Sequence, residues 1–202
     1  MNLYFRLFIG LIFAAFRRSI SVADSAQNTF RVLPTDIDLF GHMNNGRYLQ
    51  IMDVARSCWM LRSGVIGVMA KNRWSAVLGG GTIRFRRALK PLESYRVTTR
   101  LICWDRRWFY LEHGFIDQRG NCIAVGMSRA ALRHKGKWVP AQRMMDLVAP
   151  GLTSEPMPAY LRDLNDNEEK MNQAFVNAHL SATQSASTSP SERSPENLLQ
   201  AR

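Results

Sequence analysis

Residues 35–48 read TDIDLFGHMNNGRY and gather two carboxylates, a histidine and two asparagines around Gly41. Aspartate, asparagine and glycine are the usual residues of turns and helix caps, and acidic groups near a helix start are favourable by about 0.3–1 kcal/mol. The stretch therefore predicts a turn that leads into a helix, with Asn44 or Asn45 as the N-cap. It also brings carboxylates close to the unpaired amides of a helix start, so a chemical role is open as well.

A long amphipathic helix is expected directly after this turn. From Arg47 to Arg62, apolar residues recur at steps of three and four, while Asp53 and Arg56 lie on another side. Ser63-Gly64 is typical of a helix end. The apolar positions are Leu49, Met52, Ala55, Trp59 and Met60.

Segments with strand-like alternation surround the helix. One short strand is predicted before it, and four longer ones after it, separated by turn residues and rich in β-branched and aromatic side chains. We expect these four to form a consecutive antiparallel meander. One helix and about five strands form a core only if the sheet wraps the helix, which predicts an α+β fold. The segments are residues 29–34, 74–89, 94–104, 107–117 and 121–134.

Three consecutive glycines, residues 79–81, interrupt the first long strand. Glycine weakens a strand unless the backbone must bulge or allow a close approach. The sequence leaves two interpretations, a structural bulge or the floor of a groove.

The motif Asp36-x-Asp38-x-x-Gly41-His42-Met43-Asn44-Asn45-x-x-Tyr48, followed by LQIMDVAR, resembles the signature of hotdog-fold acyl-CoA thioesterases of the 4-hydroxybenzoyl-CoA thioesterase type. HMNNGRY is also similar to the HxNNxxY region of plant acyl carrier protein thioesterases. The likeness extends from about residue 29 to 133. It implies a hotdog fold, in which an antiparallel sheet wraps one central helix, and hydrolysis of an acyl-CoA thioester.

The resemblance assigns the catalytic carboxylate to Asp38. An ionised aspartate can attack a thioester carbon or activate water for that attack. Backbone amides at the start of the following helix, around residues 45–47, can polarise the thioester carbonyl. His42 either orients water or substrate, or holds the loop. Asn45 belongs with these two residues in the expected catalytic group.

The neighbouring polar residues have two interpretations each. Asn44 and Tyr48 are candidates for substrate binding, although capping and packing are their simpler roles. Asp36 either tunes its neighbour's charge or caps the loop.

Asp53 is the alternative catalytic acid, because other hotdog thioesterases carry the carboxylate on the central helix. Its spacing from Arg56 equally suits an ion pair.

The cysteines indicate neither a disulfide framework nor a zinc site. Cys58, Cys103 and Cys122 are odd in number and lack CxxC or Cys/His spacing. Cys58 is expected to be an inert core residue, with a nucleophilic role as the other interpretation. No metal and no cofactor are expected, since coenzyme A enters as part of the substrate.

The formal net charge of +11 suits nucleic acid, an anionic membrane, or a ligand with phosphates. A basic recognition helix is not evident, so nucleic-acid binding is not expected. Two basic runs are candidates for contact with the phosphates of coenzyme A, and a solvated strand edge is their other interpretation: Arg84, Arg86, Arg87 and Lys90, and Arg133, Lys135 and Lys137.

The two ends of the chain differ in composition from the middle. Residues 3–16 are apolar except for Arg6 and Gly10, and Arg17-Arg18 follows. The run is shorter than the roughly 20 residues that span a bilayer. It predicts a helix that lies in or partly enters a membrane on the cytoplasmic side, or else docks on protein. An N-terminal hydrophobic segment also occurs in a eukaryotic branch of thioesterase-like proteins that this chain resembles.

The expected organisation has four parts: residues 1–18 as the membrane-associating segment, 28–140 as the hotdog domain, 141–178 as a helical extension, and 179–202 as a disordered tail rich in serine, threonine and proline. An intracellular location is expected. The resemblance also implies a homodimer or a higher even-numbered oligomer.

Two rival functions remain at this point. One is a hotdog protein that binds acyl chains or a protein partner at a membrane without turnover. The other is a hotdog dehydratase, which would need a helix-borne acid with a suitably placed histidine, whereas His42 precedes the helix.

Overall fold

A computed structural model describes residues 2–187 of the chain, with side chains from Tyr4 to Leu180. Residues up to Pro156 form one compact unit, and a second unit begins at Met157. The first unit contains α1 (Asn2–Ala15), β1 (Ala26–Arg31), the 3-10 turn η1 (Pro34–Asp36), α2 (Asn45–Arg62), α3 (Val65–Asn72), β2 (Ser75–Phe85), β3 (Ser94–Trp104), β4 (Phe109–Asp117), β5 (Cys122–His134), β6 (Lys137–Val139) and α4 (Ala141–Val148). The second unit contains α5 (Ala159–Ser187).

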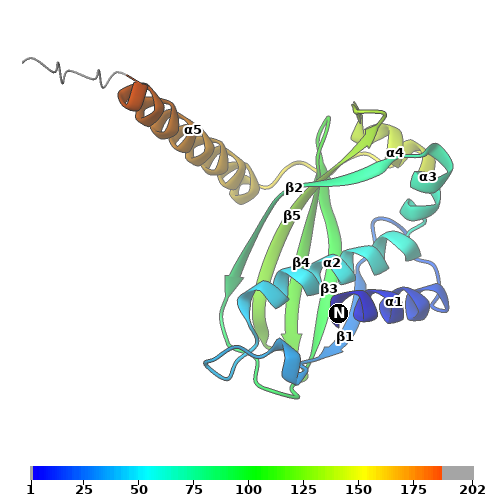
Figure 1. Cartoon of the computed structure of the whole chain (residues 1–202). Helices are drawn as coiled ribbons and strands as arrows, with labels where there is room; N and C mark the ends of the chain where they lie inside the picture. Colours follow the sequence, from blue (N-terminus) through cyan, green and yellow to red (C-terminus); the bar gives the residue numbers. More distant parts are fainter. Residues whose placement is uncertain (1, 188–202) are drawn as a thin grey trace, which may run out of the picture. The chain divides into compact units, whose positions relative to one another are not determined.

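The central helix α2 begins and ends as its sequence predicts. Asn44 is the N-cap, and its Oδ1 accepts a hydrogen bond from the Gly46 amide at 2.9 Å. At the other end Ser63 caps the helix, and Gly64 follows with a φ of +81°. A curved antiparallel sheet lies against α2 (Figure 1). The predicted α+β architecture, a sheet around one long helix, is confirmed.

The strand order is β1-β3-β4-β5-β2, with β6 pairing β5. Strands β3, β4 and β5 form the expected meander, but β2 pairs β5 and not β3. The predicted four-strand meander is therefore wrong at its first connection. The physical reason is that β1 and β4 occupy both edges of β3, so β2 cannot pair with β3 and pairs with β5 instead.

The buried face of α2 joins two apolar clusters. Around Tyr48, the aromatic rings of Phe85 and Phe115 pack at centroid distances of 5.0 and 5.2 Å. Around Trp59, the side chains of Met144 and Met145 from α4 complete the other cluster. Burying each such large side chain stabilises the fold by roughly 1.5–3 kcal/mol.

The predicted domain boundaries need three corrections. Helix α4 begins where the helical extension was predicted to begin, at Ala141, but belongs to the first unit, because its methionines are buried against Trp59. The first strand starts at Ala26, two residues before the predicted start of the hotdog domain at residue 28. Helix α5 continues to Ser187, so disorder does not begin at residue 179; residues 188–202 of that predicted tail lie outside the described residues. Helix α3 and strand β6 were not foreseen.

Gly79 lies at a bulge in β2. The register between β2 and β5 shifts between Leu78 and Gly80, which confirms the bulge interpretation. A Cβ on Gly79 would come within 2.1 Å of the Trp108 ring. The space above this glycine is therefore filled by an indole and is not an open groove floor.

His113 is a core residue on β4. It is fully buried between two hydroxyls, with Thr99 Oγ1 3.0 Å from Nδ1 and Ser128 Oγ 3.0 Å from Nε2. Burial, with a smaller contribution from the charge of Arg56, lowers the pKa of His113 to about 3. The ring is neutral at physiological pH and joins three neighbouring strands.

Helix α1 lies alongside α2 (Figure 1). Its inward face carries Gly10 and the buried Ala14, and a Cβ on Gly10 would lie 3.2 Å from Cys58 Sγ and from a methyl of Val54. The opposite face is exposed and aromatic, with Tyr4, Phe5, Phe8 and Phe13, and the exposed Phe16 follows the helix. Within residues 2–187, no helix is both long and apolar enough to cross a bilayer.

The buried His113 makes stability depend on pH. Above pH 6.5 the unfolded chain and the folded chain both carry a neutral ring, and the contribution of the buried neutral form is complete. As the pH falls from 6.5 towards 3, only the unfolded chain takes up the proton, so we expect the free energy of unfolding to fall by up to about 1.4 kcal/mol per pH unit from this residue. Urea denaturation at several pH values measures this slope.

The variant His113→Gln, which cannot titrate, is the control and should lose this part of the slope. A ring that titrates near 6.5 in an NMR titration of the folded protein would contradict the prediction.

Candidate functional site

The motif loop, residues 36–44, is a short hairpin between η1 and α2. The Asp38 amide donates to the His42 carbonyl at 2.9 Å, and Ile37 and Met43 form a β-bridge. Gly41 takes a φ of +77°, a conformation that other residues adopt only with strain. The Met43 amide donates to the Leu89 carbonyl at 2.9 Å, which fixes the hairpin to the sheet end.

Asp38 stands at the start of the hairpin turn, half-buried. Its Oδ1 accepts hydrogen bonds from the amides of Phe40 at 2.9 Å and His42 at 3.4 Å. Among the described residues, Oδ2 has no hydrogen-bond donor. One oxygen therefore orients the carboxylate, while the other remains available to a substrate or to water.

Asp36 has a different environment, although only one residue separates it from Asp38. Its side chain is 1% exposed, and Oδ2 accepts from Arg6 Nη2 at 2.5 Å and from the Leu33 amide at 2.8 Å. Arg47 Nε lies 3.6 Å from Oδ1. Asp36 therefore holds the loop, which agrees with the capping interpretation of this residue.

The hydrogen bonds in the first turn of α2 limit which backbone amide can donate to a substrate carbonyl. The Gly46 amide donates to Asn44 Oδ1, and the Arg47 amide donates to the Asn44 carbonyl at 2.9 Å. Within the described part of the chain, the Asn45 amide has no acceptor. Of the three amides considered from sequence, that of Asn45 is the one left for a substrate carbonyl.

The structure brings most of the predicted site residues together, but not all of them. His42, Asn44 and Asn45 are exposed on the same loop and helix start as Asp38. The His42 ring makes no hydrogen bond to the described residues, so the loop is held by its backbone instead. Tyr48 is 1% exposed and packs in the core, so its geometry is that of a packing residue.

Asp53 lies on the outer side of α2, away from the motif loop. Its carboxylate is 53% exposed and pairs with Arg56 at 2.5 Å. This is the ion pair that the spacing of Asp53 and Arg56 allows, and it holds the Arg56 guanidinium.

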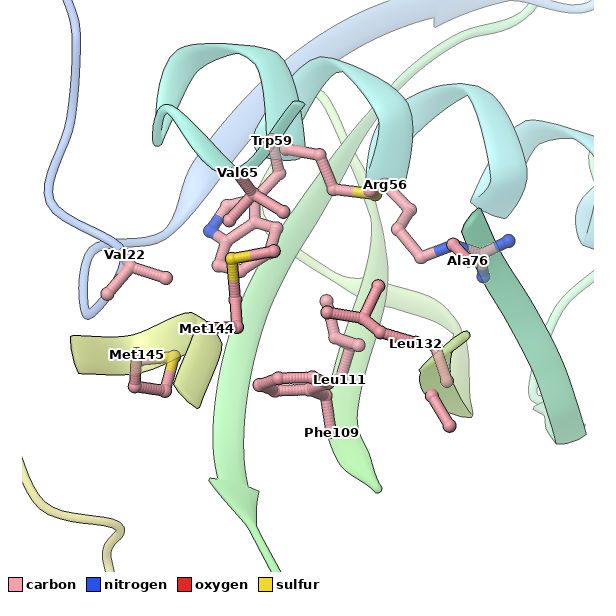
Figure 2. Close-up of a pocket in the computed structure, with 13 residues that line it drawn as sticks. Val22, Arg56, Trp59, Val65, Ala76, Phe109, Leu111, Leu132, Met144 and Met145 are labelled. Carbon is pink, nitrogen blue, oxygen red and sulfur yellow. The ribbon is translucent and has the colours of Figure 1, made fainter. Parts of the chain in front are cut away.

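Arg56 also lines an apolar cavity of about 50 Å³ between α2, the sheet and α4. Figure 2 shows Trp59, Leu111, Leu132 and Met144 around it, with the Arg56 side chain entering from α2. The cavity was not foreseen from sequence, because its walls come from six separate helices and strands and from Val22. It lies at the other end of α2 from the motif loop and is too small for a long acyl chain.

The basic runs are partly used within the fold. Arg87 binds Glu93 at 2.6 Å, and this hydrogen bond lowers the pKa of the Glu93 carboxyl. Arg133 lies over the Trp138 ring, with its guanidinium carbon 4.5 Å from the centroid. Arg87 also borders a polar groove with Arg31 and Arg119.

The cysteines are free. Cys58 and Cys103 are buried, and burial raises the pKa of both thiols, which agrees with an inert role for Cys58. Cys122 is exposed. The part of the chain that the structure describes contains no group of three or more metal-ligating side chains.

Sequence reasoning missed Arg6 as part of this site. It noted Arg6 only as an interruption of the apolar N-terminal run. Arg6 is spaced four residues from Gly10, and Gly10 four from Ala14, so the three share one face of the helix. A single cation on the face with small residues was the feature that could have indicated the Arg6–Asp36 ion pair.

The family model that matches this chain is that of the Thioesterase-like superfamily, over residues 32–147. Among curated relatives, the protein THEM6 of Xenopus laevis is 44% identical over 99 residues, 48% of this chain and 48% of the relative. The protein THEM6 of Drosophila melanogaster is 34% identical over 130 residues, 62% of this chain and 67% of the relative. The chain thus spans about half the length of the vertebrate relatives it matches.

Solved structures share the fold at low sequence identity. The probable thioesterase YbaW of Escherichia coli superposes with a TM-score of 0.57 at 18% identity, over 61% of this chain and 96% of that one. A 1,4-dihydroxy-2-naphthoyl-CoA thioesterase of Synechocystis gives a TM-score of 0.55 at 13% identity, over 64% and 98%. Because the family match covers more than half of its residues, and the sheet wraps α2 as described, this chain belongs to the Thioesterase-like superfamily and has the hotdog fold.

Proposed function

We propose that the protein hydrolyses an acyl-CoA thioester, with Asp38 as nucleophile or general base. The observation that carries the proposal is that the two oxygens of the Asp38 carboxylate differ: Oδ1 accepts hydrogen bonds from the loop amides, and Oδ2 has no donor among the described residues. Family membership supports thioester hydrolysis, and the neighbouring structure from Synechocystis is named as a thioesterase of a CoA ester. The acyl group is not specified by these features.

Two routes are chemically balanced at this carboxylate. In the first, Oδ2 attacks the thioester carbon, the C–S bond breaks, and the thiolate takes a proton from solvent; water then hydrolyses the acyl-aspartyl anhydride. In the second, Oδ2 accepts a proton from water as that water attacks the carbon, and the proton passes to the departing thiolate.

The start of α2 supplies the electrophilic assistance that both routes need. The carbonyl oxygen gains negative charge as the carbon is attacked, and an amide at a helix N-terminus stabilises that charge. We assign this role to the Asn45 amide. The exposed His42 ring is placed to orient water or the thioester.

We further propose that two copies pair through β2. Within the described chain this eleven-residue strand pairs only with β5, which leaves its other edge without a partner strand. Exposed edges of this length are templates for pairing. The edge carries Leu78, which is 51% exposed.

We also propose that the outer face of α1 binds an anionic membrane surface. Phe8 and Phe13 are 64% and 65% exposed on that face, and Arg17-Arg18 follows the helix. Aromatic side chains with adjacent arginines suit the boundary of lipid headgroups and acyl chains. A helix of 14 residues can lie on such a surface without crossing it.

Replacing Asp38 by asparagine should abolish most hydrolysis. Asparagine keeps the Oδ1 acceptor for the loop amides but can neither attack the thioester nor take a proton, so kcat/KM should fall at least 100-fold. The measurement is release of free thiol from a panel of acyl-CoA lengths by the full chain.

Asp53→Asn is the matched control and should stay within about threefold of the parent. Retained activity in Asp38→Asn would remove Asp38 from its role. Absence of hydrolysis in the parent chain, with tight binding of acyl-CoA, would favour the non-catalytic alternative.

Sedimentation velocity should show a species of twice the chain mass, and Leu78→Lys should weaken the dimer at least tenfold in Kd because it places a charge at the paired edge. Leu147→Lys on α4, where the parent leucine is equally exposed at 51%, should leave the dimer unchanged. A monomer at all concentrations would overturn the proposal.

Co-sedimentation with phosphatidylserine-containing vesicles should fall at least tenfold for Phe13→Glu, which loses an aromatic contact and adds a repelled charge. Phe175→Glu on α5, where the parent ring is 62% exposed, should bind as the parent does. Equal binding of the two variants would contradict a role for the α1 face.

A further inference from the structure

One face of α1 carries three residues spaced four apart: Arg6, Gly10 and Ala14. Gly10 permits the close approach to Cys58, and Ala14 is 3% exposed. The same face carries Arg6 towards the motif loop, with its side chain 12% exposed. The one cation of α1 is thus the residue that faces the site.

Arg6 donates hydrogen bonds to two described residues, both at the entry to the motif loop. Its Nη2 donates to Asp36 Oδ2 at 2.5 Å and to the carbonyl of Arg31 at 3.1 Å. Arg31 ends β1, and Asp36 ends η1. Arg6 therefore joins the sheet and the loop from a third element.

Asp36 links Arg6 to the residues that we propose for catalysis, Asp38 and the start of α2. Its carbonyl accepts the amide of Asn44 at 2.8 Å, so it ties the outgoing arm of the hairpin to the incoming arm. Asn44 is the N-cap of α2 and positions the first-turn amides. Asp38 lies between these two points, and its Oδ1 is held within the hairpin.

Arg47, a second arginine beside Asp36, is more distant than Arg6 and is engaged elsewhere. Arg47 lies farther away, at 3.6 Å, and also donates to Gln50 at 2.6 Å and to the Thr35 carbonyl at 3.0 Å. The adjacent Tyr95 is fully buried, and burial raises the pKa of its hydroxyl although the charge of Arg6 opposes this, so it stays neutral. Without Arg6, a carboxylate that is 1% exposed would lose its nearest counter-ion and turn towards water.

We propose that Arg6 is a positioning residue of the active site: by holding Asp36 from α1, it fixes both the Asp38 carboxylate and the helix-start amides, so that α1 is a working part of the site. The inference rests on the proposed thioesterase function for its kinetic consequence, while its structural consequence is measurable without turnover. Arg6 touches neither reacting group, so its loss acts through geometry.

The test compares four full-length forms: the parent, Arg6→Ala, Arg6→Lys and Arg62→Ala. Arg62 is the matched control, because its side chain also donates to a backbone carbonyl of another segment, that of Arg18 at 3.2 Å, but makes no hydrogen bond to the described motif loop. Acyl-CoA hydrolysis gives kcat and KM. Hydrogen exchange of residues 35–46 reports loop order, and circular dichroism confirms that each form is folded.

We expect Arg6→Ala to lower kcat at least tenfold with KM changed less than threefold, and the Asn44 amide to exchange at least tenfold faster. Arg6→Lys should recover part of kcat, and Arg62→Ala should match the parent in kcat and in exchange. The double variant Arg6→Ala/Asp36→Asn should lose no more kcat than Arg6→Ala alone, because the two residues act as a unit.

Parent activity that persists in Arg6→Ala, or loop exchange that is equal in Arg6→Ala and Arg62→Ala, would overturn the inference. If the parent hydrolyses no thioester, the proposed function fails, and faster exchange in Arg6→Ala alone still decides whether Arg6 holds the loop.

Discussion

The buried carboxylate of Asp36 is the constraint on which the site depends. It is 1% exposed, and it is compensated by Arg6 from α1, by Arg47 from α2 and by the Leu33 amide. A charge taken out of water is tolerated only with such partners. These contacts come from both sides of the loop, so the positions of α1, of the hairpin and of the start of α2 are coupled through one side chain.

The two aspartates of the motif, Asp36 and Asp38, lie in different environments and have different roles. Asp36 faces inward and is fully engaged with protein groups, while Asp38 is half-buried and engages the protein through one oxygen. Two aspartates separated by one residue thus have different roles, because the Asp36 carboxylate lies against arginines and the Asp38 carboxylate lies against backbone amides at the surface. The Asn45 amide at the start of α2 is the candidate donor to a substrate carbonyl. It has no acceptor among the described residues, because the N-cap Asn44 accepts from the next two amides, those of Gly46 and Arg47.

Much of this could be predicted from local sequence. The start and end of α2, the start of α4 and the bounds of β3 follow from capping residues and periodicity, which depend on neighbours in the chain. The candidate roles of Asp38, His42 and Asn45 came from the resemblance to a family motif. What could not be predicted is non-local. Strand β2 crosses to β5 because β1 and β4 already occupy β3, and Arg6 pairs with a residue 30 positions away. The end of α5 at Ser187 was missed because serine, threonine and proline composition was taken as disorder from residue 179 onward.

The most direct test of the account compares Asp36→Asn and Asp38→Asn in the same full-length protein, by urea denaturation and by acyl-CoA hydrolysis. The account predicts that Asp36→Asn lowers the free energy of unfolding by about 1–3 kcal/mol, because Arg6 loses its counter-ion. It predicts that Asp38→Asn leaves stability within about 0.5 kcal/mol, because the amide oxygen still accepts the loop amides, and lowers kcat/KM at least 100-fold. The opposite pattern, with Asp38→Asn destabilised and active and Asp36→Asn stable and inactive, would contradict it.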